Sequence, residues 1–95
     1  MDHLYMVFYD IRCQRRWRRI FKKMKGYGEW VQLSVFQCRL GKVRALEMED
    51  ALRTLVNQRE DHILIMDFGP ADAIRPKVRS IGKAFSPIER RAIII

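Results

Sequence analysis

The first run of apolar positions in this chain is also its clearest. Residues 4–9 read Leu-Tyr-Met-Val-Phe-Tyr, and the run ends at the carboxylate of Asp10. The run is too short for a buried helix, and Val, Phe and Tyr favour pleated, packed surfaces. Because it has no polar face, we predict a central strand that is covered on both sides. Asp10 then lies at the carboxyl end of that strand.

Two segments have the apolar spacing of amphipathic helices. In residues 12–25 the apolar positions fall at i, i+3, i+4 and i+7, namely Trp17, Ile20, Phe21 and Met24. This stripe predicts a helix packed on the core, ended by the glycines of residues 26–28. A second helix is predicted over residues 41–58. Its apolar stripe consists of Ala45, Met48, Leu52, Leu55 and Val56.

The remaining segments predict strands and loops. Residues 29–40 alternate with period two, but the stretch is long for one strand. A bend or hairpin near residues 34–37 is therefore an open alternative. Residues 62–68 predict another strand, closed by Gly69-Pro70. We expect a loop over 71–77, a short strand over 78–85 with a bulge at Gly82, a helical turn from 86 and a strand over 92–95.

The order of these elements indicates an α+β fold. Strand, helix, extended stretch, helix and strand form a ferredoxin-like sandwich, with two helices on one face of a mainly antiparallel sheet. The chain length predicts a single domain over residues 1–95. The apolar C-terminal strand must pair with a sheet edge of its own chain or of a partner. Residues 86–95 are therefore expected to be a tail that contacts a partner, with the strand exchanged in a homodimer.

Charge is concentrated in the first helix. The formal net charge is +8 and the pI about 10.1, which favours a polyanionic partner. Every charged residue between positions 12 and 25 is Arg or Lys. Like charges at i, i+3 and i+4 destabilise an isolated helix, so we infer that a function is the reason for keeping them. We predict phosphate contacts with little sequence specificity. The candidates are Arg12, Arg15, Arg16, Arg18, Arg19 and Lys22, followed by Arg75, Lys77 and Arg79.

Several classes of protein are disfavoured. No apolar run approaches the ~18 residues of a membrane span, and the N-terminus lacks the layout of a signal peptide. We expect a cytoplasmic protein with no membrane partner. Cys13 and Cys38 form no CxxC pair and no zinc spacing, so we expect ordinary reduced thiols. His3 and His62 are isolated in the sequence.

At this point the residues resemble a known family. Met6-Val7-Phe8-Tyr9-Asp10-Ile11, the Arg-rich helix after it and Val31-Gln32-Leu33-Ser34-Val35-Phe36 are similar to the small CRISPR-associated adaptation subunit, the Cas-two family. The resemblance covers nearly the whole chain. It implies a ferredoxin-like fold and a symmetric homodimer that bridges integrase subunits and holds a short DNA duplex. The chain departs from the family at Arg12-Cys13-Gln14, where an acidic residue is common, and at Trp30, where a basic residue is common.

Three interpretations of Asp10 are open. Asp10 can cap the first helix, because aspartate is among the best N-cap residues. It can pair with Arg12, Arg15 or an arginine of a partner chain. The third interpretation comes from the resemblance, because some members of the family are described as metal-dependent nucleases. In it, two Asp10 carboxylates share one Mg²⁺ across a dimer axis. The sequence shows no histidine or second carboxylate nearby as a general base. Further site candidates are Tyr9, Ser34 and Phe36.

Together these observations predict a homodimeric scaffold that binds duplex DNA in CRISPR spacer acquisition. The first alternative is a metal-dependent endonuclease, acting on DNA or RNA, in which Asp10 is the catalytic residue. A third possibility is a toxin-like ribonuclease or a module for single-stranded RNA. An RNA module of this fold needs aromatic residues exposed on the sheet, and the candidates for stacking are Tyr9, Trp30 and Phe36.

Overall fold

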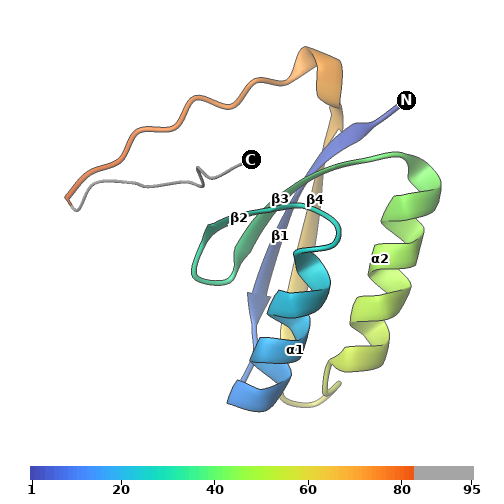
Figure 1. The fold of residues 1–95 in the computed structure, drawn as a ribbon, viewed down its shortest axis with the longest axis vertical. Coiled ribbons are helices and arrows are strands. Elements are labelled where there is room, and N and C mark those ends of the chain that lie inside the picture. The colour runs from blue at the N-terminus through green and yellow to red at the C-terminus, as the bar shows by residue number, and fades with distance from the viewer. Residues whose placement is uncertain (83–95) are drawn as a thin grey trace.

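The computed structural model describes residues 1–82, and in this range two α-helices lie on one face of a four-stranded sheet (Figure 1). The elements are β1 (His3–Asp10), α1 (Gln14–Met24), β2 (Glu29–Gln32), β3 (Val35–Leu40), α2 (Lys42–Leu55), β4 (His62–Pro70) and the 3-10 helix η1 (Ala71–Ala73). The strand order is β2-β3-β1-β4, and each pairing is antiparallel. This confirms the predicted α+β, ferredoxin-like fold.

The strand β1 is central, as predicted, but only one of its faces is fully covered. Val7 and Tyr9 point toward the helices and are buried. On the other face Leu4 is buried near η1, whereas Met6 and Phe8 remain partly exposed. Within residues 1–82, the predicted cover of the second face is therefore not formed. That face, which we call the open face, has no helix over it within the described residues (Figure 1).

The core lies between the sheet and the two helical stripes. Of the predicted α1 stripe, Ile20 and Met24 are fully buried, and Trp17 and Phe21 pack against the core. Of the α2 stripe, Met48 and Leu52 are buried. The remaining members of the α2 stripe are partly buried against the same cluster, namely Ala45, Leu55 and Val56. Both helices are thus held by tertiary packing of one apolar face, which is the main source of helix stability in proteins.

The extended stretch over residues 29–40 is a hairpin, so the second alternative is confirmed. Leu33 and Ser34 form the turn, and Leu33 has φ 40°, in the left-handed region. This turn contains no glycine or asparagine. Tertiary contacts hold its backbone in place. Trp17 Nε1 donates to Ser34 Oγ at 2.8 Å, and the Tyr9 amide donates to the Ser34 carbonyl at 3.0 Å. Trp30 Nε1 donates to the Leu33 carbonyl at 2.9 Å.

After β4 the structure differs from the predictions. The expected loop over 71–77 opens with η1, and residues 78–82 form no strand. Gly82 has φ 92°, but it lies in irregular chain and not in a bulged strand. Four predicted features lie outside the described residues. They are the rest of the strand over 78–85, the helical turn from 86, the strand over 92–95 and the partner-contacting tail. No helix within residues 1–82 is long and apolar enough to cross a membrane.

Candidate functional site

Asp10 ends β1 as an exposed residue on the open face. Alternation along the strand puts it there, because its neighbour Tyr9 faces the helices. The N-cap of α1 is Cys13, and no side chain caps that helix end. The interpretation of Asp10 as the helix cap is therefore wrong, because the helix begins too far along the chain.

The second interpretation, an ion pair with a neighbouring arginine, is not formed within the described chain. The salt bridges among residues 1–82 do not include Asp10, and neither Arg12 nor Arg15 contacts its carboxylate. Residues 1–82 also hold no cluster of three or more His, Cys, Asp or Glu that could bind a metal ion. Within residues 1–82, a metal ion at Asp10 would therefore have fewer than three such side chains as ligands, and water or groups outside this range, such as those of a second copy of the chain, would supply the rest.

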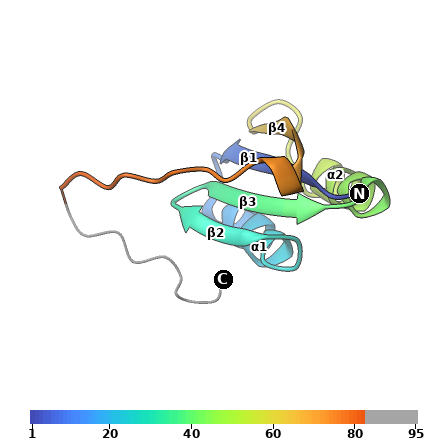
Figure 2. The same cartoon turned by 90° about the horizontal axis from the view of Figure 1, so that it is seen from above.

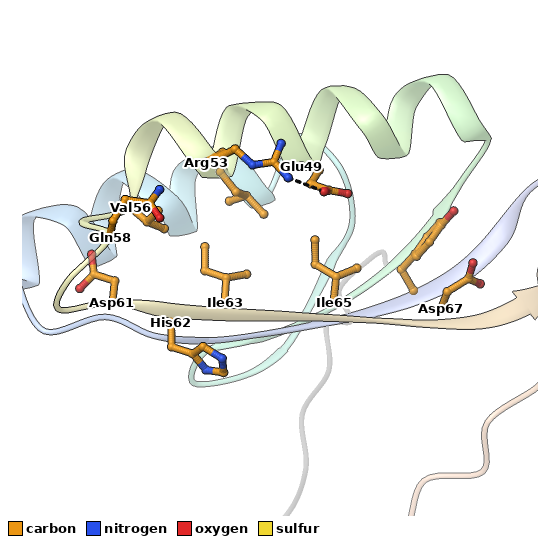
Figure 3. Close-up of a pocket in the computed structure, with 11 residues that line it drawn as sticks. Glu49, Arg53, Val56, Gln58, Asp61, His62, Ile63, Ile65 and Asp67 are labelled. Atoms are coloured by element: carbon orange, nitrogen blue, oxygen red, sulfur yellow. Dashed lines mark hydrogen bonds and ion pairs between the residues drawn. The ribbon is translucent and has the colours of Figure 1, made fainter.

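His62 is the residue that reasoning from sequence missed. It is the direct partner of Asp10 in the antiparallel pairing of β1 with β4. Figure 3 shows the His62 side chain on the opposite side of β4 from Ile63 and Ile65, which face α2. The expectation that no histidine lies near Asp10 is therefore wrong. One signal could have revealed it: in a β4-β1 antiparallel pair, the first residue of one strand lies opposite the last residue of the other.

Asp10 and His62 line a shallow hollow of about 380 Å³ on the open face. Its apolar floor includes Phe8, Val35 and Leu64, and the hairpin turn at Leu33-Ser34 forms one wall. The hydrogen bond from the Tyr9 amide to the Ser34 carbonyl holds this wall against β1. Ser34 thus borders the predicted site, while its hydroxyl accepts the hydrogen bond from Trp17.

The aromatic candidates on these strands are core residues. Tyr9 is 5% exposed and Phe36 is fully buried, so neither ring can stack on a base. Burial raises the pKa of the Tyr9 hydroxyl, and this hydroxyl has no hydrogen-bond partner within the described chain. Trp30 is 43% exposed, but its Nε1 is committed to the hairpin turn. Of the predicted stacking residues, Tyr9 and Phe36 are therefore unavailable to a base.

The outer surface of α1 carries the cations predicted to contact phosphate. The exposed cations of α1 that make no ion pair within residues 1–82 are Arg15, Arg18, Arg19, Lys22 and Lys23, and the exposed Arg12, which precedes the helix, joins them. We call this set the α1 cationic face. It lies on the helix side of the sheet, whereas Asp10 and His62 lie on the open face. The two candidate sites therefore occupy opposite faces of the fold.

Arg16 differs from the other predicted arginines because it is engaged internally. Its Nε donates to Asp61 at 2.7 Å, and its Nη2 donates to Glu60 at 3.0 Å. These acids come from the connection between α2 and β4, so residues distant in the sequence balance the charge of the helix at this position. Arg16 is the predicted phosphate contact least available to a ligand.

Asp61 is the centre of this contact. Its side chain is 0% exposed, and it also accepts hydrogen bonds from the backbone amides of Arg12 at 3.0 Å and Asn57 at 2.8 Å. The hydrogen bonds from Arg16, supported by those amides, hold the pKa of the Asp61 carboxyl well below its usual range. The contact joins the start of α1 to the start of β4, and so it fixes the segments on either side of Asp10 and His62.

A groove of about 530 Å³ continues the cationic face between α1 and α2. The Cζ atom of Arg44, on α2, lies 4.4 Å from the centre of the Tyr27 ring, and Nη2 of Arg44 donates to the Gly26 carbonyl at 2.9 Å. The groove also contains Arg19, Lys22 and Lys23. Arg75, Lys77 and Arg79 lie elsewhere, exposed on the irregular segment that runs out past the sheet in Figure 2.

Comparisons with known proteins agree with the resemblance to the Cas-two family. Residues 3–73 match the family model described as CRISPR associated protein Cas2. The chain is 61% identical over 95 residues to the CRISPR-associated endoribonuclease Cas2 of Geobacter sulfurreducens, covering 100% of both chains. It is 52% identical to the CRISPR-associated endoribonuclease Cas2 1 of Rhodospirillum rubrum, over 99% of this chain and 92% of the relative.

A solved structure supports the same assignment. The crystal structure of a protein described as cas2 superposes with a TM-score of 0.77 at 30% identity. The superposition covers 92% of this chain and 94% of that one. The matched residues 3–73 include β1 with Asp10, the cationic helix α1, and β4 with His62. With this agreement of sequence and fold, the chain belongs to the CRISPR-associated Cas2 family.

Proposed function

We propose that this Cas2-family chain is a homodimeric subunit of CRISPR spacer acquisition, which binds duplex DNA and bridges the integrase subunits. The observation that carries the proposal is the α1 cationic face. Its cations are exposed and, within residues 1–82, unpaired with any carboxylate. A surface of this kind suits the phosphates of a duplex, because Arg and Lys position a backbone without reading its bases.

A homodimer is supported by the open face. The exposed apolar side chains there include Leu64 (48%), Met66 (43%) and Phe68 (44%) on β4, beside Met6 and Phe8 on β1. A contiguous apolar patch of this kind marks an interface in soluble proteins. In a symmetric dimer built on this face, the α1 cationic face would appear twice, once on each protomer and on the outside of the assembly.

The salt dependence of DNA binding tests the proposal. Each phosphate that the protein neutralises contributes about −0.9 to the slope of log affinity against log salt. The variant Arg15→Gln/Arg18→Gln should make that slope shallower by about 0.9 for each phosphate that is no longer neutralised. A matched control is Arg53→Gln/Arg59→Gln, which removes the same charge from α2 and from the α2–β4 connection. An unchanged slope in the α1 variant, or an equal change in the control, would contradict the proposal.

The bridging role needs a test of its own. Spacer integration by the reconstituted complex should proceed with the wild-type dimer and fail with Arg15→Gln/Arg18→Gln, if duplex binding by α1 is part of assembly. Sedimentation must first show that the variant remains a folded dimer. Full integration with this variant would show that Arg15 and Arg18 of α1 are not required for integration.

A second candidate function is cleavage of nucleic acid, and two observations favour it. The Geobacter and Rhodospirillum relatives are named endoribonucleases. Asp10 is exposed and, within residues 1–82, free of any ion pair or side-chain hydrogen bond. A free carboxylate suits a hard divalent cation, which needs only one or two protein carboxylates. Asp10 from each of two copies would hold the ion, which supplies an activated water and stabilises the leaving oxygen.

Asp10→Asn separates the two functions. The substitution keeps the size of the side chain and removes its negative charge. If Asp10 takes part in cleavage, the variant should remain a dimer, keep its salt-dependent binding of DNA and lose nuclease activity. Cleavage at the wild-type rate by the variant would exclude the nuclease role, and it would leave the DNA-binding role in place.

A further inference from the structure

We propose that His62 is a second metal ligand beside Asp10, so that the site prefers a divalent first-row transition ion over Mg²⁺. The inference deepens the second candidate function and rests on it, because the site is completed only by two copies of the chain. The resemblance to the Cas-two family implies no role for His62. Its assignment comes from the pairing of β1 with β4.

The register of the two strands brings the side chains together. Asp10 and His62 are direct partners across an antiparallel pair, and such partners have Cβ atoms about 4.5–5.5 Å apart on the same face. A carboxylate oxygen and an imidazole nitrogen projecting from that separation can both reach one ion at about 2.0–2.2 Å. Both residues are exposed, and both line the hollow on the open face.

Neither the Asp10 carboxylate nor the His62 imidazole makes an ion pair or a side-chain hydrogen bond within residues 1–82. The other histidine and two other aspartates of the chain differ in this respect. The other histidine, His3, has its Nδ1 bonded to Asp67 at 2.9 Å. Asp67 also accepts a bond from the Gly69 amide, and Asp61 is occupied by Arg16. Among the described residues, Asp10 and His62 are thus a carboxylate and an imidazole that lie side by side with their ligand atoms unused.

The surroundings of the two ligands carry no other charge and include several apolar side chains. Phe8, Val35 and Leu64 form the floor of the hollow, and the other side chains around it are uncharged. A low-polarity surrounding strengthens the attraction between a cation and a carboxylate. The same residues belong to the open face, so the surface that would form the dimer also contains the ligands.

The donor set determines the class of ion. Each chain contributes one carboxylate and one imidazole, so two copies related by a two-fold axis contribute two of each. Mg²⁺ takes oxygen ligands and keeps several waters. Imidazole suits zinc and the other late first-row ions. A mixed site of two imidazoles and two carboxylates therefore favours an ion such as Zn²⁺ or Co²⁺.

Titration with Co²⁺ tests the inference without relying on activity, because its visible absorption reports the ligands of the ion. The full chain, free of any histidine tag, should bind one Co²⁺ per two chains and resist displacement by excess Mg²⁺. His62→Asn should weaken binding at least about tenfold, as expected when a ligand is removed. His3→Asn is the matched control and should bind as the wild type does, since the chain contains only these 2 histidines.

A second measurement keeps the test decisive if His62→Asn disturbs the dimer. In the wild-type protein, bound Co²⁺ should shift the imidazole NMR signal of His62 and leave that of His3 in place. Binding that depends on Asp10 but leaves His62 unaffected would overturn this inference and keep the Asp10 metal site. Absence of any Asp10-dependent binding would overturn both, while the salt dependence of DNA binding would still test the scaffold role separately.

Discussion

At the scale of single residues, Tyr9 and Asp10 show how a strand separates two neighbours. Tyr9 is buried beneath the helices, and its hydroxyl lacks a partner within residues 1–82. Asp10 is exposed on the opposite face. A strand turns successive side chains to opposite sides, so the two residues have different roles although they are adjacent.

Tyr9→Phe should make the protein more stable. The substitution removes a buried hydroxyl without a partner and keeps the ring that packs on Phe36 and Trp17. An unsatisfied buried polar group costs about 1–3 kcal/mol, so the free energy of unfolding should rise by about 1 kcal/mol. Urea denaturation measures it, with Tyr5→Phe at a partly exposed position as the control. A fall in stability would mean that the hydroxyl has a partner.

The lowered pKa of the Asp61 carboxyl predicts that the folded protein loses stability in acid. The pKa of its carboxyl is lowered in the folded state, so below the ordinary aspartate pKa of about 3.9 the unfolded chain binds a proton that the folded chain does not. Stability therefore rises with pH in that window. The contribution is complete above pH about 5 and is lost as the pH falls toward the lowered folded value.

The test for Asp61 is a series of denaturation curves between about pH 2 and 5. Wild type should lose stability more steeply with acid than Asp61→Asn, which should already be less stable at neutral pH. Asp72→Asn removes a carboxylate from an exposed position in η1 and serves as the control. Equal acid sensitivity in wild type and Asp61→Asn would show that the contact with Arg16 does not couple to folding.

At the scale of elements, the end of α1 is set by close packing of backbone. The Gly28 amide donates to the Met24 carbonyl at 3.0 Å, and the chain then enters β2 beside β3. A Cβ atom at Gly28 would overlap the Cys38 Sγ and the Gln37 carbonyl oxygen. The sequence places glycines at this helix end, but only the close approach of Gly28 to Gln37 and Cys38 of β3 explains why position 28 needs one.

Gly28→Ala should therefore destabilise the fold by about 1–3 kcal/mol, as overpacking in a dense core does. Gly26→Ala is a matched control two residues away. A Cβ there would meet only the Lys23 carbonyl oxygen, at 3.4 Å. Its effect should stay within about 0.5 kcal/mol. Thermal or urea denaturation of both variants measures the difference, and equal stabilities would show that β3 yields easily at Cys38.

At the scale of the whole molecule, the fold leaves one sheet face uncovered. The helices cover the face that carries Val7 and Phe36, while Leu64, Met66 and Phe68 remain exposed on the other. A small domain buries a limited fraction of its surface and often gains stability by association. The open face is the part of this molecule that such association would bury.

Leu64→Lys should weaken the proposed homodimer by at least about tenfold, because a two-fold interface would bury the new charge twice without a partner. Analytical ultracentrifugation over a range of concentrations measures the change. Leu46→Lys is the control, since Leu46 is 53% exposed on α2, on the helix side of the molecule. A dimer that tolerates lysine at position 64 would exclude the open face as its interface.

The sequence by itself determined the elements and their class. The period of 3.6 at Trp17, Ile20 and Met24 and the unbroken apolar run before Asp10 are local patterns, and local patterns follow from the geometry of helices and strands. Element order then predicted the ferredoxin-like arrangement. The concentration of Arg and Lys in α1 was equally visible, because it needs no knowledge of distant residues.

The tertiary structure alone decided which distant groups meet. Pairing of β1 with β4 set His62 beside Asp10, and the connection between α2 and β4 brought Asp61 to Arg16. The hairpin turn at Leu33-Ser34 has no glycine or asparagine, and Trp17 and Tyr9 hold it from other elements. These contacts depend on strand register and packing, and no pattern of neighbouring residues encodes them.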